Sequence, residues 1–73
     1  MAIKPFLQGE TFDPDLVATM SHALVDACKM LGILARLDDP TVEVLAMRII
    51  RQARAGVRDR KLLTAVAVDG LAR

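Results

Sequence analysis

The chain has 73 residues, of which 53% are apolar, and its formal net charge at pH 7 is +1. A single cysteine, Cys28, excludes an internal disulfide, and one histidine with one cysteine cannot complete a four-ligand zinc site without carboxylates. A chain this short buries only about 60% of the surface that its unfolded form exposes, so its high apolar fraction favours association between subunits.

The near-neutral total charge conceals a division of charge along the sequence. Residues 1–47 hold seven acidic and three basic residues, a net charge of −4, whereas residues 48–73 hold seven basic and two acidic residues, a net charge of +5. The chain is therefore dipolar. Its basic half could meet a phosphate, an acidic partner or the acidic half of the same chain.

Residues 1–12 are predicted to form an extended N-terminal arm that carries both phenylalanines, Phe6 and Phe12. Burial of each ring is worth about 1.5–3 kcal/mol, so we expect the arm to lie across the helices or across a neighbouring subunit. The first residues lack the basic region and long apolar run of a signal peptide, and no stretch has the roughly eighteen apolar residues of a membrane span. We expect a cytoplasmic protein that does not contact a membrane.

The first helix is predicted over residues 14–31. Asp13 can accept a hydrogen bond from a free amide at the helix start, Pro14 suits the first helical position, and Gly32 can form a left-handed cap at the end. Apolar residues recur between these positions at helical spacing: Leu16, Val17, Met20, Leu24, Ala27, Cys28 and Leu31.

A second helix is predicted over residues 40–55 and a third over residues 60–72. Asp38-Asp39-Pro40 repeats the start signal, Gly56 marks an end, and Asp59 can cap the third helix. The expected buried positions are Val42, Leu45, Ala46, Ile49, Ile50 and Ala53 on the second helix, and Leu62, Leu63, Val66, Ala67 and Leu71 on the third. No alternating run predicts a strand. The sequence thus predicts an all-α protein, with one small three-helix bundle over residues 13–73 after the arm.

The candidate partner-binding site is a set of four arginines that we call the arginine ridge: Arg48, Arg51, Arg54 and Arg58. They fall within an arc of about 120° on an ideal helix, with Arg58 just past its end. The ridge could be a solvated face paired in part with acids of the first helix, a surface for an acidic protein, or a set of phosphate contacts continued by Arg60 and Lys61. Nucleic acid is the least favoured of these partners, because the third helix has few polar side chains for reading bases and the basic half has no aromatic residue for stacking on them.

Other candidate residues favour structural roles. His22 and Asp26 are spaced to touch on the polar face of the first helix, but no nucleophile accompanies them. Cys28 is expected in the core, while Met30 and Met47 fall at the edges of apolar faces and could line a subunit contact. The sequence has no glycine-rich phosphate loop and no metal-ligand pattern. We therefore expect that the protein is not an enzyme, has no catalytic residue and binds no cofactor or metal.

The chain contains Phe12-Asp13-Pro14, then Ala46-Met47-Arg48-Ile49-Ile50, then Gly56-Val57-Arg58-Asp59. In these motifs it resembles a group of short alphaproteobacterial helical proteins that share Phe-Asp-Pro, Ala-x-Arg-Ile-Ile and Gly-x-Arg-Asp before a last helix. The resemblance covers roughly residues 12–68 and implies a compact helical fold, with no assigned activity and no catalytic residue to transfer. Val57 and the apolar residues 33–35 depart from the shared pattern, and both add hydrophobic surface.

Taken together, these features predict a non-enzymatic helical protein that acts through protein contacts and associates with itself as a homodimer or a larger oligomer. The alternative is a nucleic-acid-binding module that uses the arginine ridge.

Overall fold

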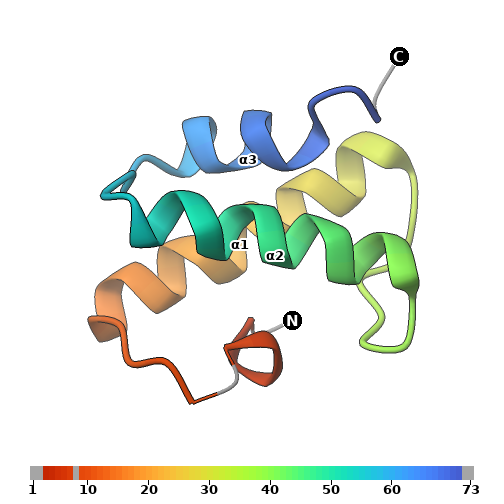
Figure 1. Ribbon diagram of the computed structural model, residues 1–73. Helices are drawn as coiled ribbons and strands as arrows, with labels where there is room; N and C mark the ends of the chain where they lie inside the picture. The colour runs from red at the N-terminus through yellow and green to blue at the C-terminus, as the bar shows by residue number, and fades with distance from the viewer. Residues whose placement is uncertain (1–2, 8, 72–73) are drawn as a thin grey trace.

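The computed structural model describes residues 3–7 and 9–71, and within them every regular element is helical (Figure 1). Three α-helices pack together: α1 (Pro14–Leu31), α2 (Pro40–Arg54) and α3 (Arg60–Val68). A short 3-10 helix, η1 (Lys4–Phe6), precedes them. The predicted all-α three-helix bundle is confirmed.

The chain reverses direction between successive helices. Figure 1 shows α1 and α3 running one way and α2 running the opposite way, packed against both of them. The C-terminal end of α1, the N-terminal end of α2 and the C-terminal end of α3 therefore meet at one end of the bundle, which we call the α1–α2 loop end.

An aspartate caps the start of each α-helix, as the sequence predicts. The Asp13 carboxylate accepts a hydrogen bond from the Asp15 amide at 2.8 Å, and Asp39 accepts one from Thr41 at 2.8 Å. The third cap, Asp59, accepts a hydrogen bond from the Lys61 amide at 2.8 Å. Proline occupies the first position of α1 and of α2, where its missing N–H leaves no helical hydrogen bond unmade.

The observed helix ends agree with the predicted ends best where the sequence carries a clear end signal. Gly32 ends α1 in the left-handed region at φ 69°, as predicted, and α2 ends at Arg54, one residue before the predicted end. By contrast, α3 ends at Val68 although the prediction extended it to Ala72, which lies outside the described residues. The backbone leaves the helical region at Asp69 (ψ 125°), before the positive φ of Gly70, which ordinary helix continuation would not allow.

The core lies between the three helices. All six positions predicted to be buried on α2 are buried, and on α1 the buried residues are Leu16, Met20, Ala23, Leu24, Ala27 and Cys28. The prediction for α3 was wrong in part, because Leu62 is 56% exposed and Leu71 is 41% exposed.

The buried face of α3 consists of Leu63 and Ala67, as predicted, together with Thr64 and Val68. These positions recur at helical spacing, and Leu62 lies on the opposite side of the helix from them. Thr64 is accommodated because its hydroxyl donates a hydrogen bond to the Arg60 carbonyl oxygen at 2.8 Å.

The N-terminal arm packs on its own bundle mainly through aliphatic side chains. Ile3 is fully buried and Leu7 is 8% exposed, whereas Phe6 and Phe12 are only partly buried against the core. The Ile3 amide donates a hydrogen bond to the Ser21 hydroxyl of α1 at 3.0 Å. The expectation of a wholly extended arm was wrong, since η1 turns it; Met1, Ala2 and Gln8 lie outside the described residues.

Candidate functional site

The structure gives the first arginine of the ridge a role within the fold. Arg48 is half-buried, and its Nη1 donates hydrogen bonds to the main-chain oxygens of Ala67 at 3.2 Å and Asp69 at 2.7 Å. The last carbonyls of a helix have no partner within it and carry partial negative charge, so a guanidinium is well suited to bind them. Arg48 therefore fastens α2 to the C-terminal end of α3.

Arg54 is also engaged within the chain. Its Nε donates a hydrogen bond to Glu10 Oε1 at 2.9 Å, and its Nη2 bonds to the same oxygen. The pairing of the ridge with acids of the first helix was thus predicted with the wrong partner, because the acid belongs to the arm. Both side chains are substantially exposed, so this ion pair contributes little stability at moderate salt.

The remaining two arginines of the ridge, Arg51 and Arg58, point into solvent. Both residues are exposed, and neither guanidinium makes a hydrogen bond or an ion pair within residues 3–7 and 9–71. The ridge therefore divides into Arg48 and Arg54, whose guanidiniums are bound within the chain, and Arg51 and Arg58, whose charges have no such partner in the described residues.

Arg51 borders a shallow hollow on the outer face of α2. The hollow has a volume of about 230 Å³, and it is lined by Glu43, Val44, Met47, Arg48 and Arg51. Val44 is 44% exposed and Met47 is 42% exposed, so two apolar side chains lie between an acidic residue at one end and arginines at the other. Sequence reasoning singled out the arginines and Met47 but missed Glu43, although its spacing of four residues from Met47 places both on one side of the helix.

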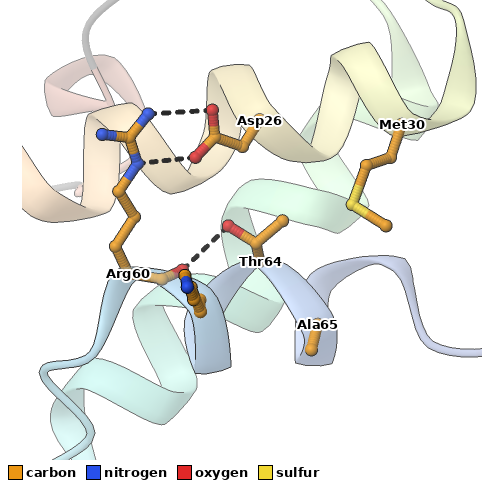
Figure 2. Close-up of a pocket in the computed structure, with 6 residues that line it drawn as sticks. Asp26, Met30, Arg60, Thr64 and Ala65 are labelled. Atoms are coloured by element: carbon orange, nitrogen blue, oxygen red, sulfur yellow. Dashed lines mark hydrogen bonds and ion pairs between the residues drawn. The ribbon is translucent and has the colours of Figure 1, made fainter.

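Asp26 binds Arg60 rather than His22. Arg60 donates two hydrogen bonds to the Asp26 carboxylate, from Nε to Oδ2 at 2.6 Å and from Nη2 to Oδ1 at 2.9 Å (Figure 2). These bonds hold the pKa of the Asp26 carboxyl below its usual value, against the opposing effect of partial burial, and they raise the pKa of Arg60. His22 is exposed, and its side chain makes no hydrogen bond within the described part of the chain. His22 and Asp26, the pair considered for base catalysis, are therefore not paired. Asp26 instead forms a two-bond ion pair with Arg60, which joins α1 to α3.

The Asp26–Arg60 ion pair lies beside an open groove of about 540 Å³ between α1 and α3. Figure 2 shows Met30 and Ala65 along the groove and the Asp26–Arg60 pair at one side of it. Lys61 and Thr64 complete the lining. The Thr64 hydroxyl and the Asp26 carboxylate both have partners within the protein, so the groove offers apolar surface rather than a set of converging reactive groups.

Cys28 lies in the core, as its neighbours in the sequence predict. Its side chain belongs to the buried cluster and is 2% exposed. Burial raises the pKa of the Cys28 thiol, and the negative charge of Asp39 raises it further. A buried thiol that stays protonated is a poor nucleophile and a poor metal ligand. In residues 3–7 and 9–71, no group of three or more His, Cys, Asp or Glu side chains is placed to hold a metal ion.

Large apolar side chains remain exposed on the surface. Five of them belong to the α1–α2 loop end or to the first turns of α2: Met30, Leu34, Leu37, Val44 and Leu71. Leu34 is 73% exposed and Met30 is 59% exposed. Met47 follows one turn after Val44, so the apolar surface of this end continues along the outer face of α2.

None of the helices in the described ranges is long and apolar enough to cross a lipid bilayer. Comparison of the chain with protein-family models, with curated proteins and with solved structures found no match. The resemblance to short alphaproteobacterial helical proteins stays a prediction.

Proposed function

We propose that this protein is a non-enzymatic, cytoplasmic helical protein that acts through protein–protein contacts and associates with copies of itself. The observation that carries the proposal is the exposed apolar surface of the α1–α2 loop end and of α2. Single exposed apolar residues are common on soluble proteins, but a group of them on adjoining segments is typical of an interaction surface.

The size of the chain supports the same proposal. A domain of 73 residues has a small core and correspondingly small stability, and contact with a second copy would bury apolar surface that one chain alone cannot cover. Met30, Met47 and the leucines of the loop have flexible or unhindered side chains that can adapt to a partner.

Nucleic-acid binding has less support than protein association. Of the six basic residues suited to phosphate contacts, Arg48, Arg54 and Arg60 already make hydrogen bonds within the chain. A phosphate would have to compete with these partners. Arg51, Arg58 and Lys61 remain exposed without such a bond in the described residues, and three cations give only a weak, salt-sensitive attraction.

Sedimentation velocity and light scattering over a concentration series test the proposal. We expect a mass above that of the 7.9 kDa chain, which falls toward the monomer value on dilution. A strict monomer up to high micromolar concentration contradicts self-association. Gel retardation with DNA and RNA at low salt, performed on the same preparation, tests the nucleic-acid alternative.

A further inference from the structure

We infer that the outer face of α2 docks on the same face of a second copy, with the two helices antiparallel about a two-fold axis that passes near Met47. This inference rests on the proposed self-association and names the surface that carries it. The occupant is a second copy of this chain because the charges of the face complement themselves.

The face is built on a simple spacing. Glu43, Met47 and Arg51 follow one another at intervals of four residues, so their side chains lie in a row along one side of α2. Val44 and Arg48 flank this row, and all five residues line the same hollow. The row therefore reads acidic, apolar, basic from the N-terminal to the C-terminal part of the helix.

In an antiparallel pairing about a two-fold axis, this row lies against the same row of the second copy, which runs in the opposite direction. With Met47 opposite Met47 of the second copy, Glu43 lies opposite Arg51 of the second copy, and Arg51 lies opposite its Glu43. Each interface then contains two equivalent ion pairs around an apolar centre, as an isologous contact requires. A parallel pairing would instead place Glu43 beside Glu43 and Arg51 beside Arg51, which like-charge repulsion disfavours.

The charges of the row have no competing partner on their own helix. Glu43 and Arg51 are separated by about 12 Å along the helix axis, at a rise of about 1.5 Å per residue, so they cannot pair with each other. Neither makes an ion pair among the residues that the structure describes. In this they differ from Arg48 and Arg54, whose guanidiniums are already bound.

Charges around the row strengthen the same orientation. Asp38 and Asp39 lie at the N-terminal end of α2, while Arg54 lies at its C-terminal end. Antiparallel docking brings each acidic end to a basic end and also opposes the two helix dipoles favourably. Glu43, Met47 and Arg51 are all exposed, so the row can approach another helix. Figure 1 shows α2 at the front of the bundle, with η1 and α3 on either side of it.

The groove between α1 and α3 is a weaker docking site. Its carboxylate and guanidinium already satisfy each other, and the charge that remains in its lining, Lys61, is of one sign only, so the groove does not complement itself. The α2 face, by contrast, presents unpaired charge of both signs together with apolar surface. A contact limited to one helix face buries less than about 1,200 Å² and is expected to be weak, in the micromolar range.

Two charge-reversal variants and their mixture test the inference. In Glu43→Arg, two attractive pairs of the dimer become arginine–arginine pairs, and in Arg51→Glu they become glutamate–glutamate pairs. We expect each variant alone to dimerise about tenfold more weakly than the original chain or worse. When the two variants are mixed, both ion pairs form again between unlike chains, so a heterodimer of nearly the original affinity is expected.

Sedimentation equilibrium at low salt measures these affinities, with Arg58→Glu as a control that makes the same charge change away from the row. Far-UV circular dichroism confirms that each variant keeps its helices. If the original chain dimerises and all variants dimerise equally well, the α2 interface is wrong while self-association stands. If the original chain is a strict monomer, self-association fails and the interface fails with it. Equal weakening by Arg58→Glu, or no recovery in the mixture, also overturns the specific pairing.

Discussion

Arg48 Nη1 lies 2.7 Å from the main-chain oxygen of Asp69, 21 positions later in the chain. The contact joins the middle of α2 to the point where α3 ends, and the same nitrogen also binds the Ala67 carbonyl oxygen. A long basic side chain thus supplies hydrogen bonds that the helix cannot make for itself at its C-terminus. This finding changes the interpretation of the arginine ridge, because one of its members is explained by the fold alone.

Replacement of Arg48 by methionine is expected to lower the free energy of unfolding by about 1–3 kcal/mol, since it removes charge-assisted hydrogen bonds and leaves partly covered carbonyls unpaired. Urea denaturation followed by circular dichroism measures the loss. Arg58→Met is the matched control, because it removes the same charge from an exposed position, and a change within about 0.5 kcal/mol is expected there. Equal losses in both variants would show that the hydrogen bonds to α3 contribute nothing.

Asp26 should make stability depend on pH in the acidic range. Its pKa is lowered in the folded protein, so the folded state favours the charged carboxylate, and this contribution is fully present above the ordinary carboxyl pKa of about 3.9. It is lost as pH falls through the lower pKa of the folded state. We expect Asp26→Asn to be less stable than the original chain at neutral pH and the difference to shrink in strong acid.

Thermal unfolding of both chains between neutral and strongly acidic pH measures this effect. Arg60→Gln should reproduce the neutral-pH loss, and the double variant should lose no more than either single one, because the two side chains act as a pair. A difference between Asp26→Asn and the original chain that stays constant across the pH range would contradict the prediction.

The arm should contribute to stability through Ile3 in particular. Ile3→Ala creates a cavity at a fully buried position, and a loss of about 2–5 kcal/mol is expected. Leu34→Ala, which removes a similar side chain from a site that is 73% exposed, should have little effect in the monomer. Chemical denaturation at a concentration low enough to keep the chain monomeric makes the comparison. If Ile3→Ala has no effect, the arm does not pack on the bundle in solution.

Gly32→Ala should cost about 1–2 kcal/mol, because the φ angle of 69° at the end of α1 is strained for a residue with a Cβ. An added Cβ would meet no heavy atom within 4 Å, so the loss measures backbone strain alone. Gly32→Asn is expected to cost less, since asparagine tolerates the left-handed region. Equilibrium unfolding of the two variants tests the order, and an alanine variant as stable as the original would exclude a left-handed cap.

The parts of the fold that the sequence predicted well depend on neighbouring residues. Asp13 and Asp39 bond to amides two positions away, and the prolines after them have a preset φ angle, so the starts of α1 and α2 follow from short segments. The buried faces of α1 and α2 follow from a long helical period. The buried face of α3 was harder to predict, because a helix of nine residues with apolar side chains on several sides shows no clear period. Packing against α1 and α2 decides that Thr64 is buried and Leu62 is exposed.

The candidate site divides in the same way. The four arginines, Met47 and the separation of charge are visible in the sequence, and so is the row of Glu43, Met47 and Arg51 once α2 is recognised as a helix. Which charges are already paired could not be predicted, because Glu10 and Arg54 are 44 positions apart and Asp26 and Arg60 are 34 positions apart. Contacts over such distances depend on how the helices are placed.

The sequence by itself thus determined the three helices, their aspartate caps and most of their buried faces, because capping and helical periodicity act over a few residues. The tertiary structure alone decided that Ile3 anchors the arm, that α3 ends at Val68, and that the guanidiniums of Arg48 and Arg54 are bound within the chain while those of Arg51 and Arg58 are not. These outcomes depend on which groups, far apart in the chain, the packed helices bring into contact. The local sequence around each group does not determine such contacts.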